Sequence, residues 1–140
     1  MSDRAIVLDA NILIRAVLGK RVRELLVENA DRVQFFSPDV AYADARKYLP
    51  SLLEKRGIQS ESAMAVLDAL ETIVFPLELG VYADFKVQAL QRIAIRDADD
   101  WPVLACAMTI ACPVWTEDAD FFGTGVATWT TDRVELYLAV

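Results

Sequence analysis

Acidic side chains gather on both sides of one apolar stretch in this 140-residue chain. The segment reads RDADDWPVLACAMTIACPVWTEDADFF over residues 96–122. Its aspartates are Asp97, Asp99, Asp100, Asp118 and Asp120. Two like charges about 4 Å apart repel by roughly 4 kcal/mol at an effective dielectric near 20. Carboxylates that meet in a fold must therefore shift their pKa values, stay solvated or bind a cation.

Asp9 comes directly after the apolar run AIVL at residues 5–8. A short run of this kind is typical of a buried strand in a parallel sheet, and open α/β sheets bind ligands beyond the carboxyl ends of their strands. Residues 12–18, ILIRAVL, continue with helical character, so Asp9 is also suited to cap that helix, a common role for aspartate. From these residues alone both roles of Asp9 remain open.

Asp44 lies two turns into a predicted helix over residues 38–55. The pair Ser37-Pro38 predicts the start of this helix, with serine as the N-cap and proline at the first helical position. Two explanations of Asp44 stand side by side. One is a salt bridge to Lys47, three residues on, and the other is a carboxylate directed into a cleft.

The rest of the chain alternates between predicted strands and helices. The expected strands cover residues 5–8, 33–36, 72–77, 113–116 and 126–129, and the expected helices cover 21–29, 38–55, 60–71, 81–95, 101–111 and a last one from about 131. This order indicates an α/β fold, here a single domain over residues 1–140 with a central parallel sheet of about five strands and helices on both faces. Either Asp99 or Asp100 is expected to cap the helix at 101–111.

The composition narrows the possible chemistry. Fourteen basic and twenty-one acidic residues give a net charge of −7, which argues against a surface built for tight electrostatic binding of nucleic acid. There is no histidine, and Cys106 and Cys112 match neither a zinc nor a redox spacing, so we expect two small buried side chains. No apolar run is long enough for a membrane span, and residues 1–8 lack the features of a signal peptide. A cytoplasmic protein with no membrane partner is expected.

Aspartates that follow parallel strands are expected to meet, because the carboxyl ends of such strands share one edge of the sheet. Asp9 and Asp118 belong to that edge, and Asp44 and the group at 97–100 lie at neighbouring elements. Several carboxylates with no basic partner predicted nearby indicate a site for a hard divalent cation, Mg²⁺ or Mn²⁺. Such an ion supports phosphodiester hydrolysis, and the lack of histidine removes an imidazole acid–base mechanism.

Four stretches of the chain resemble the PIN domain (PilT N-terminus) family, and within it the VapC-type toxins of bacterial toxin–antitoxin systems. They are VLDANILI at 7–14, SPDVAYADARKYL at 37–49, DADDWPVLACAM at 97–108 and WTEDADFF at 115–122. They run in the family's order and span nearly the whole chain. The resemblance implies a PIN-like fold and a metal-dependent endoribonuclease, the toxin of a type II toxin–antitoxin system.

The resemblance also implies roles for single residues. The family's four acids fall on Asp9, Asp44, Asp100 and Asp118. Of these, Asp9, Asp100 and Asp118 would hold Mg²⁺ or Mn²⁺, and Asp44 would position or activate the attacking water. Asp100 is preferred to Asp97 and Asp99 for its spacing to the small residues Ala105 and Ala107, which leaves the other two as loop or capping residues. Asn11, Thr116 and Asp120 are expected to support the site.

The partners implied by the resemblance are an RNA substrate, a second copy of the chain in a homodimer and a cognate antitoxin with a basic or amphipathic tail. Arg15, Arg46 and Arg96 flank the motifs and are candidates for contacts with RNA phosphates, although each is equally explained as a solvated or salt-bridged arginine. One departure from the family is aspartate at position 44, where glutamate is usual.

Two other functions fit the acidic residues. The first is a non-catalytic PIN-like module for binding or assembly, which the shorter acid at position 44 keeps open. The second is a phosphoacceptor domain of receiver type, which also carries acids at strand ends. A receiver needs a lysine at a late strand end, and no lysine follows Lys86 here.

Overall fold

Five parallel strands form the sheet at the centre of this α/β domain. The structure, a computed structural model, describes residues 4–139. The strands are β1 (Ala5–Leu8), β2 (Gln34–Pro38), β3 (Val74–Leu77), β4 (Val114–Trp115) and β5 (Thr128–Trp129). Their order is β3-β2-β1-β4-β5, and every neighbouring pair is parallel. The predicted fold class is confirmed, although β4 and β5 are shorter than expected.

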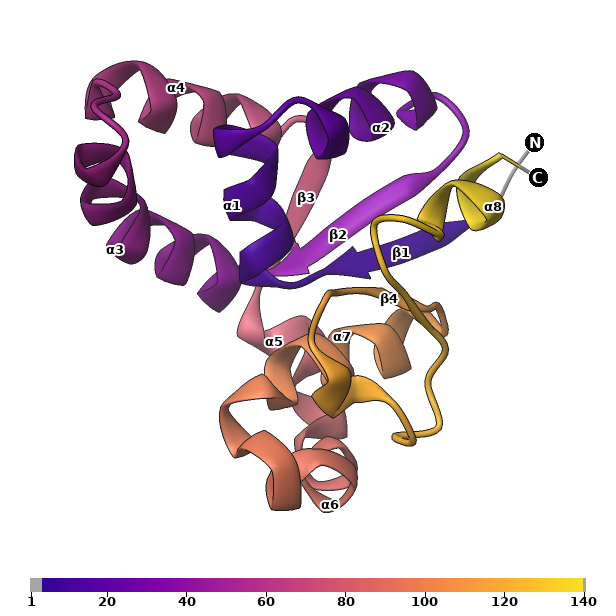
Figure 1. Ribbon diagram of the computed structural model, residues 1–140. Coiled ribbons are helices and arrows are strands. Elements are labelled where there is room, and N and C mark those ends of the chain that lie inside the picture. Colours follow the sequence, from indigo (N-terminus) through magenta and orange to yellow (C-terminus); the bar gives the residue numbers. More distant parts are fainter. Residues whose placement is uncertain (1–3, 140) are drawn as a thin grey trace.

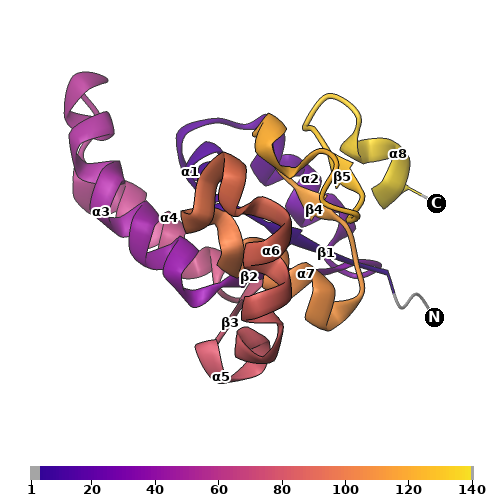
Figure 2. The same cartoon turned by 90° about the horizontal axis from the view of Figure 1, so that it is seen from below.

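Helices cover both faces of the sheet (Figures 1 and 2). One face carries α1 (Ala10–Leu18), α2 (Arg21–Asn29), α3 (Asp39–Lys55) and α4 (Ser60–Leu70), and the other carries α5 (Leu79–Tyr82), α6 (Lys86–Asp97) and α7 (Trp101–Ile110). The chain closes with α8 (Val134–Leu138), which packs against the first group. Among residues 4–139, no helix combines the length and apolar character needed to cross a membrane.

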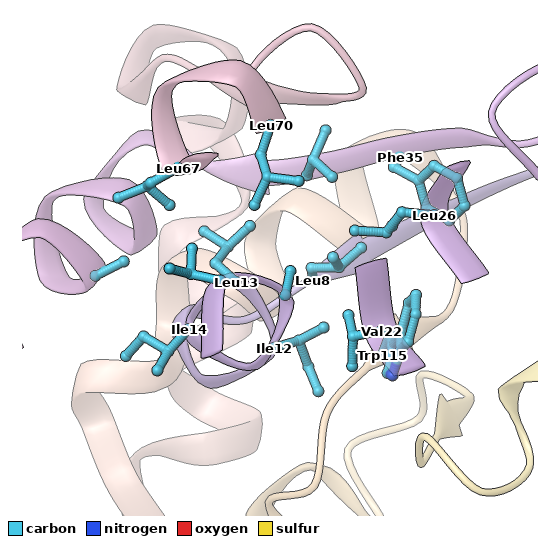
Figure 3. Packing of buried hydrophobic residues seen from close by; sticks show 14 of the residues in the cluster. Leu8, Ile12, Leu13, Ile14, Val22, Leu26, Phe35, Leu67, Leu70 and Trp115 are labelled. Atoms are coloured by element: carbon cyan, nitrogen blue, oxygen red, sulfur yellow. The ribbon is translucent and has the colours of Figure 1, made fainter. Parts of the chain in front are cut away.

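The alternation of side chains along β1 divides the core into two parts. Ile6 and Leu8 pack with the helices α1–α4, and Val7 packs with α5–α7. Figure 3 shows the first part, where Leu8 lies among leucine, isoleucine and aromatic side chains of the surrounding elements. In the second part α7 is central, as its apolar sequence predicts, because every residue from Pro102 to Ala107 is buried.

The residues Ser37 and Pro38 end β2 instead of beginning α3. Ser37 is fully buried, and its Oγ donates a hydrogen bond of 2.7 Å to the carbonyl of Leu8, where β1 ends. Pro38 is the N-cap residue of α3 and supplies no side-chain cap. The prediction of a serine cap was wrong, because the hydroxyl has a partner in the neighbouring strand that no local pattern contains. This bond joins β1 and β2 directly before Asp9.

The predicted helix at 81–95 is three elements, α5, the 3-10 turn η1 (Ala83–Phe85) and α6. The expected buried stripe largely survives the interruption, since a 3-10 turn keeps nearly the helical period. Tyr82 and Ala89 are fully buried, and Phe85 and Leu90 are half-buried. The cysteines are free thiols, one buried and one half-buried, in agreement with their prediction as small core side chains.

Candidate functional site

The pairing of β1 with β4 brings two polar residues together at the carboxyl edge of the sheet. Leu8 pairs with Trp115, so the next residues in each strand, Asp9 and Thr116, leave the sheet side by side. The order of the strands reverses here, since the chain builds outward from β1 through β2 and β3 and then returns to place β4 on the other side of β1. Open α/β sheets bind ligands at such a switch point.

Asp9 is almost fully buried, with 7% of its surface exposed, and both of its carboxylate oxygens have partners. Oδ1 accepts a hydrogen bond of 3.0 Å from the backbone N–H of Ile12 and so caps α1. Oδ2 accepts a short hydrogen bond from the Thr116 hydroxyl. Burial raises the pKa of Asp9 above its usual value, and these two hydrogen bonds oppose the rise. Asp9 is therefore a helix cap that also belongs to the acidic site.

Thr116 links Asp9 to the next acids. Its Oγ accepts a hydrogen bond of 2.9 Å from the backbone N–H of Asp118 while its hydroxyl hydrogen points to Asp9. Asp118 in turn caps the 3-10 turn η3 (Ala119–Phe121), because its Oδ1 accepts a hydrogen bond of 2.9 Å from the N–H of Asp120. The supporting role predicted for Thr116 has this physical basis: a single hydroxyl fixes both the side chain of Asp9 and the backbone of Asp118.

The acids before α7 lie on the 3-10 turn η2 (Ala98–Asp100). Asp97 caps this turn, because its Oδ1 accepts a hydrogen bond of 3.0 Å from the N–H of Asp99. Asp100 occupies the N-cap position of α7, but its side chain makes no capping hydrogen bond. The expectation that Asp99 or Asp100 is the N-cap residue of α7 is confirmed in position by Asp100, but the expected side-chain cap is absent, and the carboxylate that caps here, Asp97, caps η2 instead. The side chain of Asp100 is thus left for another role.

Asp100 is a strongly perturbed acid of the site. Its carboxyl is half-buried, and within residues 4–139 its buried Oδ2 has no hydrogen-bond partner. Burial, and after it the negative charges of Asp97, Asp118, Asp9 and Asp120, raise the pKa of Asp100 to about 7. A buried carboxylate oxygen without a donor is costly unless a proton or a cation reaches it. The arrangement therefore has the electrostatics of a cation site.

One pocket of about 240 Å³ collects most of these acids. We call it the acid pocket. Its lining includes Asp9, Asp44, Asp97, Asp99, Asp100 and Asp118. Asn11, at the start of α1, lines it too, and no lysine or arginine of the described chain does. All four acids predicted as catalytic thus share one cavity, together with two more from η2 and its cap.

Asp97, Asp100 and Asp120 form the tightest group of carboxylates in the described part of the chain. Each offers one oxygen, and these oxygens lie within 4.8 Å of one another. Oxygen ligands converging at such a separation fit Mg²⁺ or Mn²⁺, and the unpartnered Oδ2 of Asp100 strengthens the match. The sequence interpretation assigned Asp97 only to the loop or to capping. One signal could have placed Asp97 in the site. Only the short turn Ala98–Asp100 separates it from Asp100, so the two carboxylates cannot lie far apart.

Asp44 lies on the exposed rim of the acid pocket. Of its two explanations, the salt bridge is absent: within residues 4–139 no ion pair joins Asp44 to Lys47. The ammonium group of Lys47 lies over the ring of Tyr48, 5.4 Å from its centroid. Asp44 is therefore free to face a ligand that enters the pocket.

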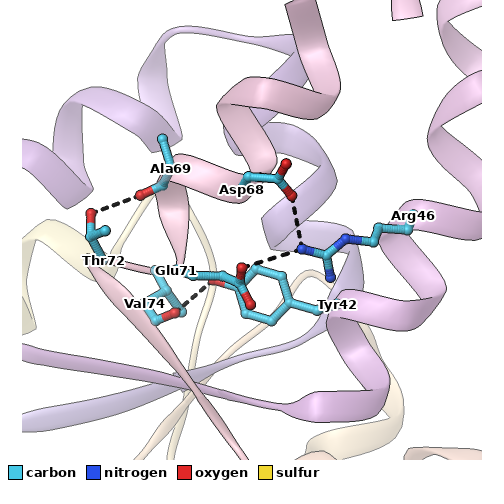
Figure 4. A network of polar contacts seen from close by, with 7 residues as sticks. All are labelled: Tyr42, Arg46, Asp68, Ala69, Glu71, Thr72 and Val74. Carbon is cyan, nitrogen blue, oxygen red and sulfur yellow. Dashed lines mark hydrogen bonds and ion pairs between the residues drawn. The ribbon is translucent and has the colours of Figure 1, made fainter. Parts of the chain in front are cut away.

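Arg46 is held by structural partners. Its guanidinium group lies 3.0 Å from Asp68 and 3.4 Å from Glu71, and 5.5 Å from the centroid of the Tyr42 ring (Figure 4). The hydroxyl of Tyr42 donates to the carbonyl of Val74 at 2.6 Å, which completes a network between α3, α4 and β3. Of the two explanations of Arg46, the structure shows the salt-bridged one. A contact between Arg46 and RNA stays a prediction.

The two other candidate arginines lie in different surroundings. Arg96 donates to the backbone carbonyls of Asp120, at 3.0 Å, and Phe122, so it holds the turn that carries Asp120. Arg15 is exposed near the end of α1 and lines a second pocket, not the acid pocket. The structure therefore brings the predicted acids together, while it separates the three arginines.

Known proteins share this fold. The model of the PIN domain family matches residues 7–139. A chain from the structure of VapBC2 from Rickettsia felis bound to a DNA fragment from their promoter is 13% identical, with a TM-score of 0.66, over 90% of this chain and 98% of that one. A chain from the structure of FitAB bound to an IR36 DNA fragment is 22% identical, with a TM-score of 0.56, over 90% and 94%. No curated protein sequence matches this chain significantly.

Proposed function

The chain belongs to the PIN domain family, and on that premise we propose that it is a metal-dependent endoribonuclease that hydrolyses phosphodiester bonds of RNA. The observation that carries this proposal is the acid pocket, where six aspartates line one cavity without a basic side chain from the described residues. A site of this charge repels a phosphodiester unless a cation offsets the carboxylates.

Asp97, Asp100 and Asp120 are the residues best placed to hold the cation, with Asp118 and Asp9 beside them. Mg²⁺ or Mn²⁺ supplies positive charge for the phosphate oxygens and a more acidic bound water. The chain's own residues complete the site. Thr116 orients Asp9 and Asp118, and Asp44 at the rim accepts a proton from the attacking water.

The biological role that we propose is that of a toxin in a type II toxin–antitoxin system. The likeness of fold to chains of VapBC2 and FitAB supports it. A cognate antitoxin with a basic or amphipathic tail suits a pocket with this charge, and a homodimer and a cytoplasmic location follow from the same family likeness.

The test of the nuclease function is an incubation of the purified protein with structured RNA and Mg²⁺ or Mn²⁺. We expect cleavage by the unaltered protein, and a loss of at least a hundredfold in rate in Asp118→Asn, which keeps the shape of the side chain. Asp31→Asn is the matched control, because Asp31 is exposed after α2 and does not line the acid pocket.

Each result is informative only for folded protein, so circular dichroism accompanies the assay. Cleavage that persists in Asp118→Asn contradicts the assignment of the site. If no RNA is cleaved with either metal, the non-catalytic binding module becomes the better description.

A further inference from the structure

A second pocket, of about 320 Å³, lies at the other end of α1 and has the opposite charge. We call it the basic pocket. Four cationic side chains line it, Arg15, Lys20, Arg21 and Arg56, and no acidic residue does. In a chain of net charge −7, such a concentration of positive charge around one cavity calls for an explanation.

Three of these four cations have no salt bridge within residues 4–139. Arg21 pairs with Glu135, whereas Arg15, Lys20 and Arg56 are exposed and form no ion pair with the described carboxylates. The first residues of α2 also face this pocket, and the residue at the N-cap, Lys20, makes no side-chain capping hydrogen bond. The backbone N–H groups at that helix start add further positive potential.

The acid pocket and the basic pocket open along one stripe of α1. Asn11 lines the acid pocket, and Arg15 and Leu18 line the basic pocket, at positions i, i+4 and i+7 of the same helix. At about 1.5 Å per residue, Asp9 and Leu18 are separated by about 14 Å along the helix. A strand with the rise of about 3.4 Å per nucleotide found in duplex DNA covers that distance in about four nucleotides, and a more extended single strand covers it in fewer. Figure 1 shows α1 running from the edge of the sheet toward the start of α2.

We propose that the basic pocket binds a phosphate group of the RNA strand, within about four nucleotides of the phosphodiester that lies in the acid pocket. The proposal rests on the proposed nuclease function. An acidic site cannot attract a polyanion by itself, so affinity has to come from cations elsewhere on the path of the strand. The shared stripe of α1 favours RNA over an acidic protein segment, because only a ligand that also enters the acid pocket needs both ends of the helix.

The experiment measures binding of a fluorescent single-stranded RNA of about 12 nucleotides between about 50 and 200 mM salt. Mg²⁺ is present to offset the carboxylates of the acid pocket, and every protein in the binding assay also carries Asp118→Asn so that cleavage is suppressed. The test variant is Lys20→Gln with Arg56→Gln. Its matched control, Lys55→Gln with Arg133→Gln, removes the same charge from exposed positions that do not line the basic pocket.

We expect the Kd of the test variant to rise at least tenfold above that of the control. The slope of log K against log salt should also flatten by about 0.7, because the pocket binds one phosphate and each phosphate contact to a single strand contributes about 0.7. A dinucleotide is too short to reach both pockets, so its rate of cleavage with Mn²⁺ should be equal in the two double variants.

Equal RNA affinity and equal salt slopes in the two double variants overturn the proposal. So does a test variant that loses binding of a polyglutamate peptide while its RNA affinity is unchanged, since the pocket then serves an acidic protein segment. Failure of the nuclease function is a separate result, an absence of cleavage in the unaltered protein, and the binding comparison can be read without it.

Discussion

The raised pKa of Asp100 predicts that the acid pocket lowers the stability of the metal-free protein at neutral pH. Its folded-state pKa of about 7 lies about three units above the ordinary value of 3.8. At about 1.4 kcal/mol per unit, this corresponds to about 4 kcal/mol, and screening at a half-exposed carboxyl reduces it to about 2 kcal/mol. We therefore expect Asp100→Asn, which removes the charge, to raise the free energy of unfolding by about 2 kcal/mol at pH 8.

The sign follows from proton binding. Because the folded pKa lies above the unfolded one, Asp100 keeps its proton in the folded state over a range where the unfolded chain has lost it. Its favourable contribution is complete below about pH 4 and is lost as the pH rises through about 7. At pH 5 the pH lies about a third of the way from the unfolded pKa of 3.8 to the folded pKa of about 7. The stabilisation by Asp100→Asn should therefore be about a third as large at pH 5 as at pH 8.

Thermal unfolding in EDTA at about pH 5 and pH 8 measures this difference. At roughly 3 °C per kcal/mol for a chain of this size, the variant should gain about 6 °C at pH 8 and about 2 °C at pH 5. Asp31→Asn is the control, with no such dependence on pH. Added Mg²⁺ should stabilise the unaltered protein at pH 8 more than the variant. The reasoning is refuted if the variant is less stable at pH 8 or gains equally at both pH values.

Substitutions at three further positions test the parts of the site that the structure connects. Thr116→Val removes the hydroxyl that joins the buried side chain of Asp9 to the backbone of the half-buried Asp118, and it should cost about 1–3 kcal/mol in urea unfolding, whereas Thr109→Val, which loses a bond within α7, should cost less than about 1 kcal/mol. Asp44→Glu should keep or raise the initial rate of RNA cleavage, and Asp44→Asn should lower it; equal rates in the two variants contradict a role for this carboxylate. Arg96→Gln should speed amide hydrogen exchange in residues 119–122, because it frees two carbonyls, and unchanged protection there would show that the turn does not depend on Arg96.

Periodicity was enough to predict the elements that build the site. The run AIVL reads as a buried strand because its side chains pack on both faces of the sheet, and that is where Ile6 and Val7 lie. The apolar helix at 101–111 reads as central for the same reason. Boundaries were less well predicted where a residue has a distant partner, as Ser37 has in Leu8.

The sequence by itself determined which acids follow strands, and so it placed Asp9 and Asp118 at the carboxyl edge of a parallel sheet. Only the tertiary structure decided that Thr116 bonds to Asp9, 107 residues away, since this pairing depends on the order and register of β1 and β4. The same holds for the group of Asp97, Asp100 and Asp120, and for the basic pocket, whose cations come from three separate helical segments. Local patterns in the sequence predict the helices, the strands and the face of each that is buried. Charged residues far apart in the chain come together only through the way these elements pack.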